Sequence, residues 1–96
     1  MVIEYRRSRY TADDTTAIMA YEDGVPYCTC SVNLSEYGMY PPEEDYIFVP
    51  TYNMFSFYEK FKNDLVEEEI CQVPIGFGFG MLVRLKENWK EIAKEL

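Results

Sequence analysis

The chain has 96 residues, of which 48% are hydrophobic and 17% aromatic, enough to build one modest core. Its formal net charge of −8 argues against nucleic acid or an anionic membrane as a direct partner. No apolar run approaches the roughly 20 residues of a membrane-spanning helix, and the amino terminus lacks the apolar region of a signal peptide. We therefore expect a single domain over residues 1–96 in the cytoplasm, where its three cysteines stay reduced.

Residues 2–10 predict a first strand, with Ile3 and Tyr5 facing inward. The far end of this strand carries three arginines, which we interpret as a solvated sheet edge that discourages aggregation: Arg6, Arg7 and Arg9. Residues 11–15 are rich in Asp and Thr and predict a turn into the next strand.

A hairpin over residues 17–34 is the clearest local pattern. Asp23 and Gly24 predict a two-residue turn, because glycine tolerates the positive φ that such turns need. After the turn the chain alternates with a period of two, and the buried face is formed by Cys28, Cys30, Val32 and Leu34. We expect this second arm, residues 27–34, at the centre of the sheet, with Val32 buried.

Residues 35–45 predict a loop, because Gly38, Pro41 and Pro42 interrupt any regular pattern. A short strand over residues 46–49 ends at Pro50, and Asn53 is the expected cap of a helix. The helix shows one apolar stripe, formed by Met54, Phe57, Tyr58, Phe61 and Leu65.

The last part of the chain predicts two strands and a closing helix. The strands cover residues 70–73 and 81–85, and a glycine-rich turn over residues 74–80 joins them beside buried Phe77 and Phe79. Residues 86–96 predict a helix whose buried side is formed by Leu85, Trp89, Ile92, Ala93 and Leu96. The expected fold class is α+β, an antiparallel sheet of about four to six strands with two helices packed on it.

The sequence offers little catalytic chemistry. It has no histidine, which removes the commonest general base and most metal sites. Cys28, Cys30 and Cys71 supply at most three thiolates for zinc, and the simpler interpretation makes Cys28 and Cys30 small core-facing residues. The glycines of residues 76–80 lack the following helix and Lys-Ser/Thr pair of a phosphate-binding loop. We therefore expect no enzyme activity, no cofactor and no metal.

Acidic residues and tyrosines are distributed unevenly along the chain. No Lys or Arg occurs between Arg9 and Lys60, and all nine tyrosines lie from Tyr5 to Tyr58. This stretch is either an ordinary solvated surface or a contact patch, in which tyrosines supply area and carboxylates attract a basic partner. The candidate partner-binding residues are Tyr37, Tyr40, Glu43, Glu44 and Asp45, together with Asp13, Asp14, Glu67, Glu68 and Glu69.

Several short motifs resemble a known family. They are Asp23-Gly24, Pro26-Tyr27, Val32-Asn33-Leu34, Val73-Pro-Ile-Gly-Phe77 and Val83-Arg-Leu85. The pattern is similar to that of small uncharacterised acidic α+β proteins encoded by phages and conjugative elements of gut bacteria. The resemblance covers residues 10–85, although Cys30 stands where Leu is more usual. It implies a mobile-element setting in a bacterial cell, but no activity and no functional residue that can be transferred.

We therefore expect a non-enzymatic mobile-element protein that inhibits a host defence protein, such as a restriction or CRISPR-type nuclease. Its acidic, tyrosine-rich surface would bind the basic nucleic-acid site of that host protein, with no direct contact to nucleic acid or membrane. A homo-oligomer is compatible with the sequence. The alternative is an anti-defence protein that binds or degrades a small nucleotide signal at residues 76–80. A structural accessory of phage or conjugation machinery is a third hypothesis.

Overall fold

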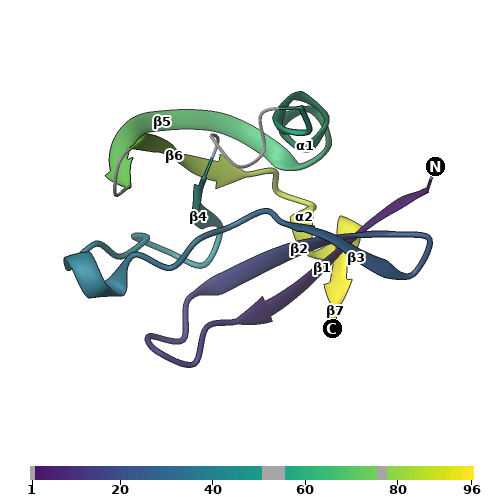
Figure 1. Ribbon diagram of the computed structural model, residues 1–96, viewed down its shortest axis with the longest axis horizontal. Helices are drawn as coiled ribbons and strands as arrows, with labels where there is room; N and C mark the ends of the chain where they lie inside the picture. Colours follow the sequence, from purple (N-terminus) through teal and green to yellow (C-terminus); the bar gives the residue numbers. More distant parts are fainter. Residues whose placement is uncertain (1, 51–55, 76–77) are drawn as a thin grey trace.

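The computed structural model describes residues 2–50, 56–75 and 78–96. Within these residues, seven strands form two sheets and two helices pack on them (Figure 1). The fold class is α+β, which confirms the prediction from the sequence.

The first sheet has the strand order β3-β2-β1-β7. β1 (Ile3–Arg9), β2 (Thr16–Glu22) and β3 (Val25–Thr29) are antiparallel neighbours, and β7 (Ala93–Glu95) pairs with β1 in parallel. The turn between β2 and β3 has φ 51° at Asp23 and 84° at Gly24, as the predicted two-residue turn requires. Tyr5 is buried and Ile3 half-buried, so the inward face of β1 is confirmed.

The second sheet has the strand order β4-β6-β5. β4 (Tyr46–Val49) has the predicted bounds, and it pairs with the central strand β6 (Gly78–Leu85). The long strand β5 (Val66–Ile75) pairs with the other edge of β6.

The main core fills the space between the two sheets. α1 (Tyr58–Leu65) closes one side of it with Phe61 and Leu65, both fully buried, and Phe57 packs just before the helix begins. These residues belong to the predicted apolar stripe. Asn53 and Met54, the predicted cap and first member of the stripe, lie outside the described residues. The cluster is completed by Tyr5, Ile18, Ala20, Cys30, Ile47, Val49, Val66, Val83, Leu85, Trp89 and Ala93.

A second, smaller core lies on the opposite face of the β4-β6-β5 sheet. Successive strand residues point to opposite faces of the sheet. The side chains of Ile47 and Val49 therefore belong to the main core, whereas that of Phe48 points to the other face. Phe48 packs with Leu34 and Val73, and Val32, Met39 and Leu82 surround them. The loop between β3 and β4 therefore covers this face of the sheet.

The second arm of the predicted hairpin is shorter than expected and lies at an edge. β3 ends at Thr29 and pairs only with β2 among the described strands, so its expected central position is wrong. Val32 is half-buried and bridges Phe48 of the other sheet, with its amide N donating to the Phe48 carbonyl at 2.9 Å. The alternation marks extended chain correctly, but it does not say which sheet that chain joins.

The hairpin of β5 and β6 replaces most of the predicted glycine-rich turn. β5 begins at Val66 and includes the acidic run, whereas the sequence predicted a strand over residues 70–73. Phe79 lies within β6 and is 61% exposed, so its predicted burial is wrong. It shares a strand face with Val83 and Leu85 but lies toward the hairpin end, beyond the core that those residues join. Phe77 lies outside the described residues.

The predicted closing helix over residues 86–96 is mostly absent. α2 (Trp89–Ile92) is a single turn, after which the chain enters β7 beside β1. Trp89 and Ala93 are buried and Ile92 half-buried as predicted, but Leu96 is 71% exposed. An isolated helix of this length gains little, whereas the edge of β1 offers backbone partners, including the Arg7 carbonyl that accepts from the Leu96 amide at 3.0 Å.

The same pairing corrects the interpretation of two of the three arginines. β7 pairs with Tyr5, Arg6 and Arg7 of β1, so Arg6 and Arg7 are not on a sheet edge. Arg9 lies beyond the end of this pairing and is exposed, as predicted. Arg6 pairs with Glu4 at 2.7 Å, and the Arg7 Nε donates to the carbonyl of Ala93 at 2.9 Å.

Candidate interaction surface

The loop over residues 30–45 carries the aromatic part of the predicted contact patch, and its first residues are anchored to the β3-β2-β1-β7 sheet. The Ser31 Oγ accepts from the Ile18 amide at 3.0 Å and lies 2.7 Å from the Tyr10 hydroxyl. The Asn33 Nδ2 donates to the Asp13 Oδ1 at 2.9 Å. The start of the loop is therefore attached to β2 and to the turn between β1 and β2.

The middle of the loop is a short helical turn, η1 (Ser35–Tyr37), placed by the burial of Leu34. The Leu34 carbonyl accepts from the amides of Tyr37 and Met39 at 3.0 and 3.2 Å. Gly38 follows with φ 73°, a backbone conformation that favours glycine. This arrangement turns Tyr37 and Tyr40 outward, where 61% and 58% of their surface is exposed.

Glu44 fastens the end of the loop. Its carboxylate accepts from the Lys90 Nζ of α2 and, at 3.2 Å, from the Arg9 Nη2 of β1. Its backbone carbonyl accepts from the Thr16 Oγ1 at 2.7 Å. The Lys90 ammonium, and after it the Arg9 guanidinium, hold the pKa of Glu44 below its usual range. Glu44 is thus a positioning residue whose charge is already paired.

The predicted loop residues therefore divide into two groups. Tyr37, Tyr40 and Glu43 are exposed, Glu44 is exposed but paired with two cations, and Asp45 is half-buried. The Asp45 carbonyl accepts from the Leu85 amide at 2.7 Å, which attaches the loop to β6. Glu36, which lies outside the predicted set, is also exposed beside Tyr37.

Asp13 and Asp14 lie in the turn between β1 and β2, next to the loop. The Asp13 Oδ1 accepts from the Thr15 Oγ1 at 2.7 Å and from Asn33, and these hydrogen bonds, that of Thr15 first, lower the pKa of Asp13. The Asp14 carbonyl accepts from the Arg9 Nη1 at 2.9 Å, and the same guanidinium contacts Glu44. The structure brings these two residues close to the end of the loop, but Asp13 has a structural role there.

Glu67, Glu68 and Glu69 lie elsewhere. They lie near the start of β5, directly after α1, and in Figure 1 α1 lies away from the loop between β3 and β4. Glu68 pairs with Arg84 at 3.2 Å, and Glu69 pairs with Lys62 at 3.3 Å. The Tyr58 hydroxyl also donates to Glu69 at 2.6 Å, and this hydrogen bond is the main cause of the lowered pKa of Glu69. The predicted residues do not form one continuous patch.

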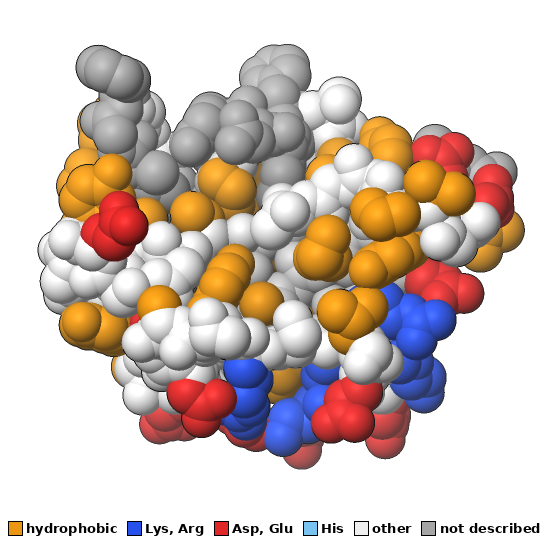
Figure 2. All heavy atoms as spheres, turned by 60° about the horizontal axis from the view of Figure 1, so that its bottom comes forward, with side chains coloured by type: hydrophobic (Ala, Val, Ile, Leu, Met, Phe, Trp, Pro, Cys, Tyr) orange, Lys and Arg blue, Asp and Glu red, His pale blue; other side chains and the backbone are white. Residues whose placement is uncertain are grey.

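The face drawn in Figure 2 shows no single acidic patch. Asp and Glu side chains there are dispersed, and those along its lower edge alternate with Lys and Arg. Several other predicted residues are exposed as well, but only the loop combines exposed carboxylates with the exposed tyrosines of the predicted set; the others are Asp14, Glu44, Glu67, Glu68 and Glu69. We define this part of the loop as the loop surface, formed by Glu36, Tyr37, Tyr40 and Glu43.

The sequence interpretation missed the cations that hold Glu44. Arg9 was assigned to a solvated edge, and Lys90 lies 46 residues from Glu44 along the chain. One feature of the sequence does point to the origin of these cations. Since no Lys or Arg occurs between Arg9 and Lys60, any cation that pairs with the acidic loop must come from outside that stretch.

The part of the chain that the structure describes forms neither a metal site nor a phosphate-binding loop. No group of three or more His, Cys, Asp or Glu residues there is placed to hold a metal ion. Cys28 is half-buried and Cys30 buried, while Cys71 is exposed on β5. Gly78 and Gly80 belong to β6, so this part of the glycine pattern is strand rather than a loop before a helix.

Comparisons with protein-family models, with curated proteins and with solved structures found no match. Among the described residues, no helix has the length and apolar character needed to cross a membrane.

We expect the free energy of unfolding to fall as the pH is lowered from about 5 to about 2. The hydrogen bonds of Asp13 and the cations beside Glu44 lower both pKa values in the native state, so the unfolded chain binds more protons in this range. Stability is therefore present above the unfolded pKa and lost as the pH falls through the native pKa. Urea titrations at several pH values measure this slope. The Asp13→Asn, Glu44→Gln variant should show a flatter acid limb, whereas an unchanged limb would contradict the assignment.

Proposed function

We propose that this protein is a non-enzymatic binding protein whose loop surface docks on a basic site of a partner protein. The partner class that we propose is a nucleic-acid-binding host defence enzyme, such as a restriction or CRISPR-type nuclease, which the protein would inhibit in the setting of a mobile element. The observation that carries the proposal is the outward presentation of Tyr37 and Tyr40 on an anchored loop.

The aromatic part of the loop surface suits protein recognition. Exposed tyrosines offer large contact area and one polar group each, and they are common among the residues that dominate binding energy. The backbone hydrogen bonds from Tyr37 and Met39 to Leu34, and the pairing of Glu44, fix both ends of the segment that carries them. A loop that is already held in place loses less conformational entropy when it binds.

The charge of the loop surface favours a basic partner. Glu36 and Glu43 are exposed and form no ion pair with another residue of the described ranges. The loop contains no Lys or Arg, and the whole chain carries a net charge of −8. Such a surface is attracted to the basic grooves with which nucleic-acid enzymes bind phosphate, and like charge keeps it away from nucleic acid itself.

The test is to measure the affinity of loop-surface variants for a partner captured from host lysate and identified by mass spectrometry. We expect Tyr37→Ala combined with Tyr40→Ala to weaken binding by about 100-fold or more, because central aromatics dominate interfaces. Glu36→Gln with Glu43→Gln should weaken it by about 2- to 30-fold, since exposed ion pairs are each worth about 0.2–1 kcal/mol. Affinity should also fall as salt is raised from about 50 to 500 mM.

The matched control removes two charges from another surface. Glu87 and Glu91, near α2, are exposed and can be changed together to Gln. This variant should bind like the wild-type protein. Equal losses in the two double Gln variants would show that net charge alone matters. A partner without a basic nucleic-acid site, or unchanged affinity in the tyrosine variant, would overturn the proposal.

A further inference from the structure

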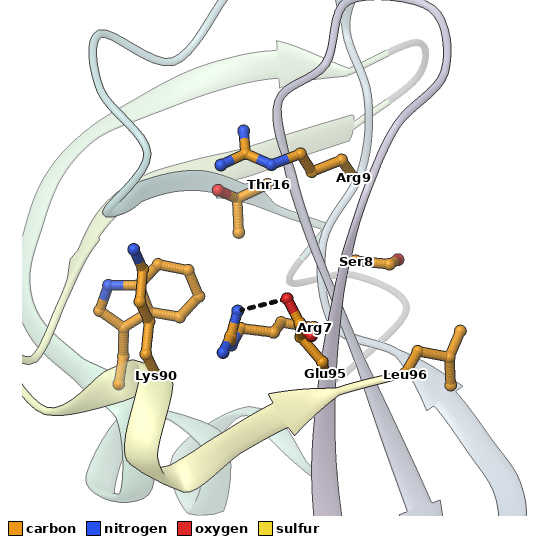
Figure 3. A pocket seen from close by; sticks show the side chains of 8 residues that line it. Arg7, Ser8, Arg9, Thr16, Lys90, Glu95 and Leu96 are labelled. Atoms are coloured by element: carbon orange, nitrogen blue, oxygen red, sulfur yellow. Dashed lines mark ion pairs between the residues drawn. The ribbon is translucent and has the colours of Figure 1, made fainter.

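A cavity of about 430 Å³ lies between β1, β2, α2 and β7, apart from the loop surface. Its lining includes Arg7, Arg9 and Lys90, which are three of the nine cationic side chains of an acidic protein. In Figure 3, Arg7 and Arg9 extend from β1 toward the same side, where Lys90 of α2 and Thr16 of β2 also lie. Because Arg7 and Arg9 are two residues apart on one strand, their side chains share a face of the sheet.

The Arg7 guanidinium is held in place by the backbone of β7. Its Nε donates to the Ala93 carbonyl at 2.9 Å, and its side chain is only 26% exposed. The nearest carboxylate, that of Glu95, lies 3.7 Å from the Arg7 Nη1 and is 82% exposed, so water screens much of this ion pair. The outer nitrogens of Arg7 therefore retain capacity to bind a further anion.

The other two cations already bind an oxyanion of the chain itself. The Glu44 carboxylate accepts from Arg9 and from Lys90, one oxygen to each. The Lys90 ammonium also lies 5.7 Å from the centre of the Trp89 ring, which helps to keep it at the cavity. Glu44 supplies a single negative charge between two cations, and Arg7 lies on the same side of the sheet.

We propose that this cavity binds a small ligand through a phosphate group, which Arg7, Arg9 and Lys90 contact together. A phosphate dianion presents three oxygens and up to two charges, which matches three cations that line one cavity better than one carboxylate does. The volume lies in the range of small-molecule sites, roughly 300–1,000 Å³, and exceeds the roughly 30 Å³ of one water molecule. The ligand is thus a small phosphomonoester or the free ion, and the acidity of the rest of the chain disfavours a polynucleotide.

The ligand competes with Glu44 for Arg9 and Lys90. Removing a cation should therefore weaken ligand binding, whereas removing the Glu44 charge should strengthen it. Adenosine monophosphate, inorganic phosphate and adenosine are titrated into the full chain by calorimetry. We expect saturable 1:1 binding of the monophosphate and none of adenosine. Arg7→Gln or Lys90→Gln should weaken binding by about 10- to 100-fold, because each removes charged hydrogen bonds. Glu44→Gln should strengthen it by removing the internal competitor.

The control is Arg84→Gln, which removes one positive charge from β6, where Arg84 pairs with Glu68. It should leave phosphate affinity within about twofold of the wild type.

The two phosphate ligands distinguish the free ion from an ester. If inorganic phosphate binds as tightly as the monophosphate, the cavity recognises the free ion. Tighter binding of the monophosphate shows that the rest of the ester is also contacted. Lys90 lies at the surface, so its variant tests the cavity even if Arg7→Gln fails to fold. No saturable binding, or equal losses in Lys90→Gln and Arg84→Gln, would overturn the proposal without affecting the loop surface.

Discussion

Replacing Leu34 with alanine is expected to lower the free energy of unfolding by about 2–5 kcal/mol, the usual cost of emptying a buried leucine site. Leu34 is 2% exposed and forms the centre of the second core with Phe48 and Val73. Its carbonyl also accepts the amides of Tyr37 and Met39. The Leu34→Ala variant should therefore lose stability and also hold the loop surface less firmly. Urea unfolding and partner affinity measure the two effects.

The matched variant is Tyr37→Ala, which changes the exposed side of the same loop. Tyr37 is 61% exposed, so its loss should change stability by no more than about 0.5 kcal/mol. From the proposed function, we expect this variant to lose partner affinity at full stability. A Leu34→Ala protein as stable as the wild type would contradict the role of the second core. A large loss of stability in Tyr37→Ala would show that this tyrosine is structural.

Local patterns in the sequence were sufficient for much of the fold. The Asp23-Gly24 turn depends on two adjacent residues, and its positive φ values are found as expected. The strand over residues 46–49 and the burial of Phe57, Phe61 and Leu65 follow from short-range periodicity in the same way. In each case the information lies within a few neighbouring residues.

Two of the errors concern pairing between distant segments. The alternation in residues 28–34 is real, but whether Val32 extends β3 or crosses to Phe48 depends on a strand that comes later in the chain. The apolar spacing of Trp89, Ile92 and Ala93 fits a helix, yet the last residues find backbone partners on β1. The periodic spacing of apolar residues indicates which side chains share a buried face, but it does not identify the strand against which they pack.

The residues of the candidate surface could be predicted from the sequence, but not which of their carboxylates are free to bind a partner. The sequence identified Tyr37, Tyr40 and Glu43, which are exposed. It also identified Glu44, whose carboxylate is paired with two cations, and Asp13, whose Oδ1 accepts hydrogen bonds within the protein. Distinguishing the two kinds requires knowing that Arg9 and Lys90 meet at Glu44, a contact between β1, the loop and α2. That contact is a product of the tertiary fold.

Glu44 also connects the two proposals physically. Its carboxylate faces Arg9 and Lys90, which line the cationic cavity, while its backbone belongs to the loop that presents Tyr37 and Tyr40. A phosphate that displaced this carboxylate would free one end of the loop, although the Thr16 hydroxyl would still hold the Glu44 carbonyl. Binding at the cavity is therefore expected to loosen one end of the loop, and Glu44→Gln is the variant that alters both the cavity and the loop.

Changing Ala93 to Asp is expected to unfold much of the protein, whereas the same change at Leu96 should have little effect. Ala93 is fully buried in the main core, opposite Tyr5 of β1, so an aspartate there would place an unpaired carboxylate among apolar side chains. We expect a loss of at least about 3 kcal/mol from a total of about 5–15 kcal/mol, and a melting temperature lower by roughly 15 °C or more.

Leu96→Asp decides between a closing helix and a terminal strand. A helix over residues 86–96 would bury Leu96 on the same side as Ala93, and both aspartates would then be severely destabilising. In the structure Leu96 is 71% exposed, and its backbone amide can still donate to the Arg7 carbonyl after the substitution. Its melting temperature should stay within about 4 °C of the wild type. Thermal unfolding followed by circular dichroism distinguishes the two cases, because equal losses in both variants would require the helix and exclude the pairing of β7 with β1.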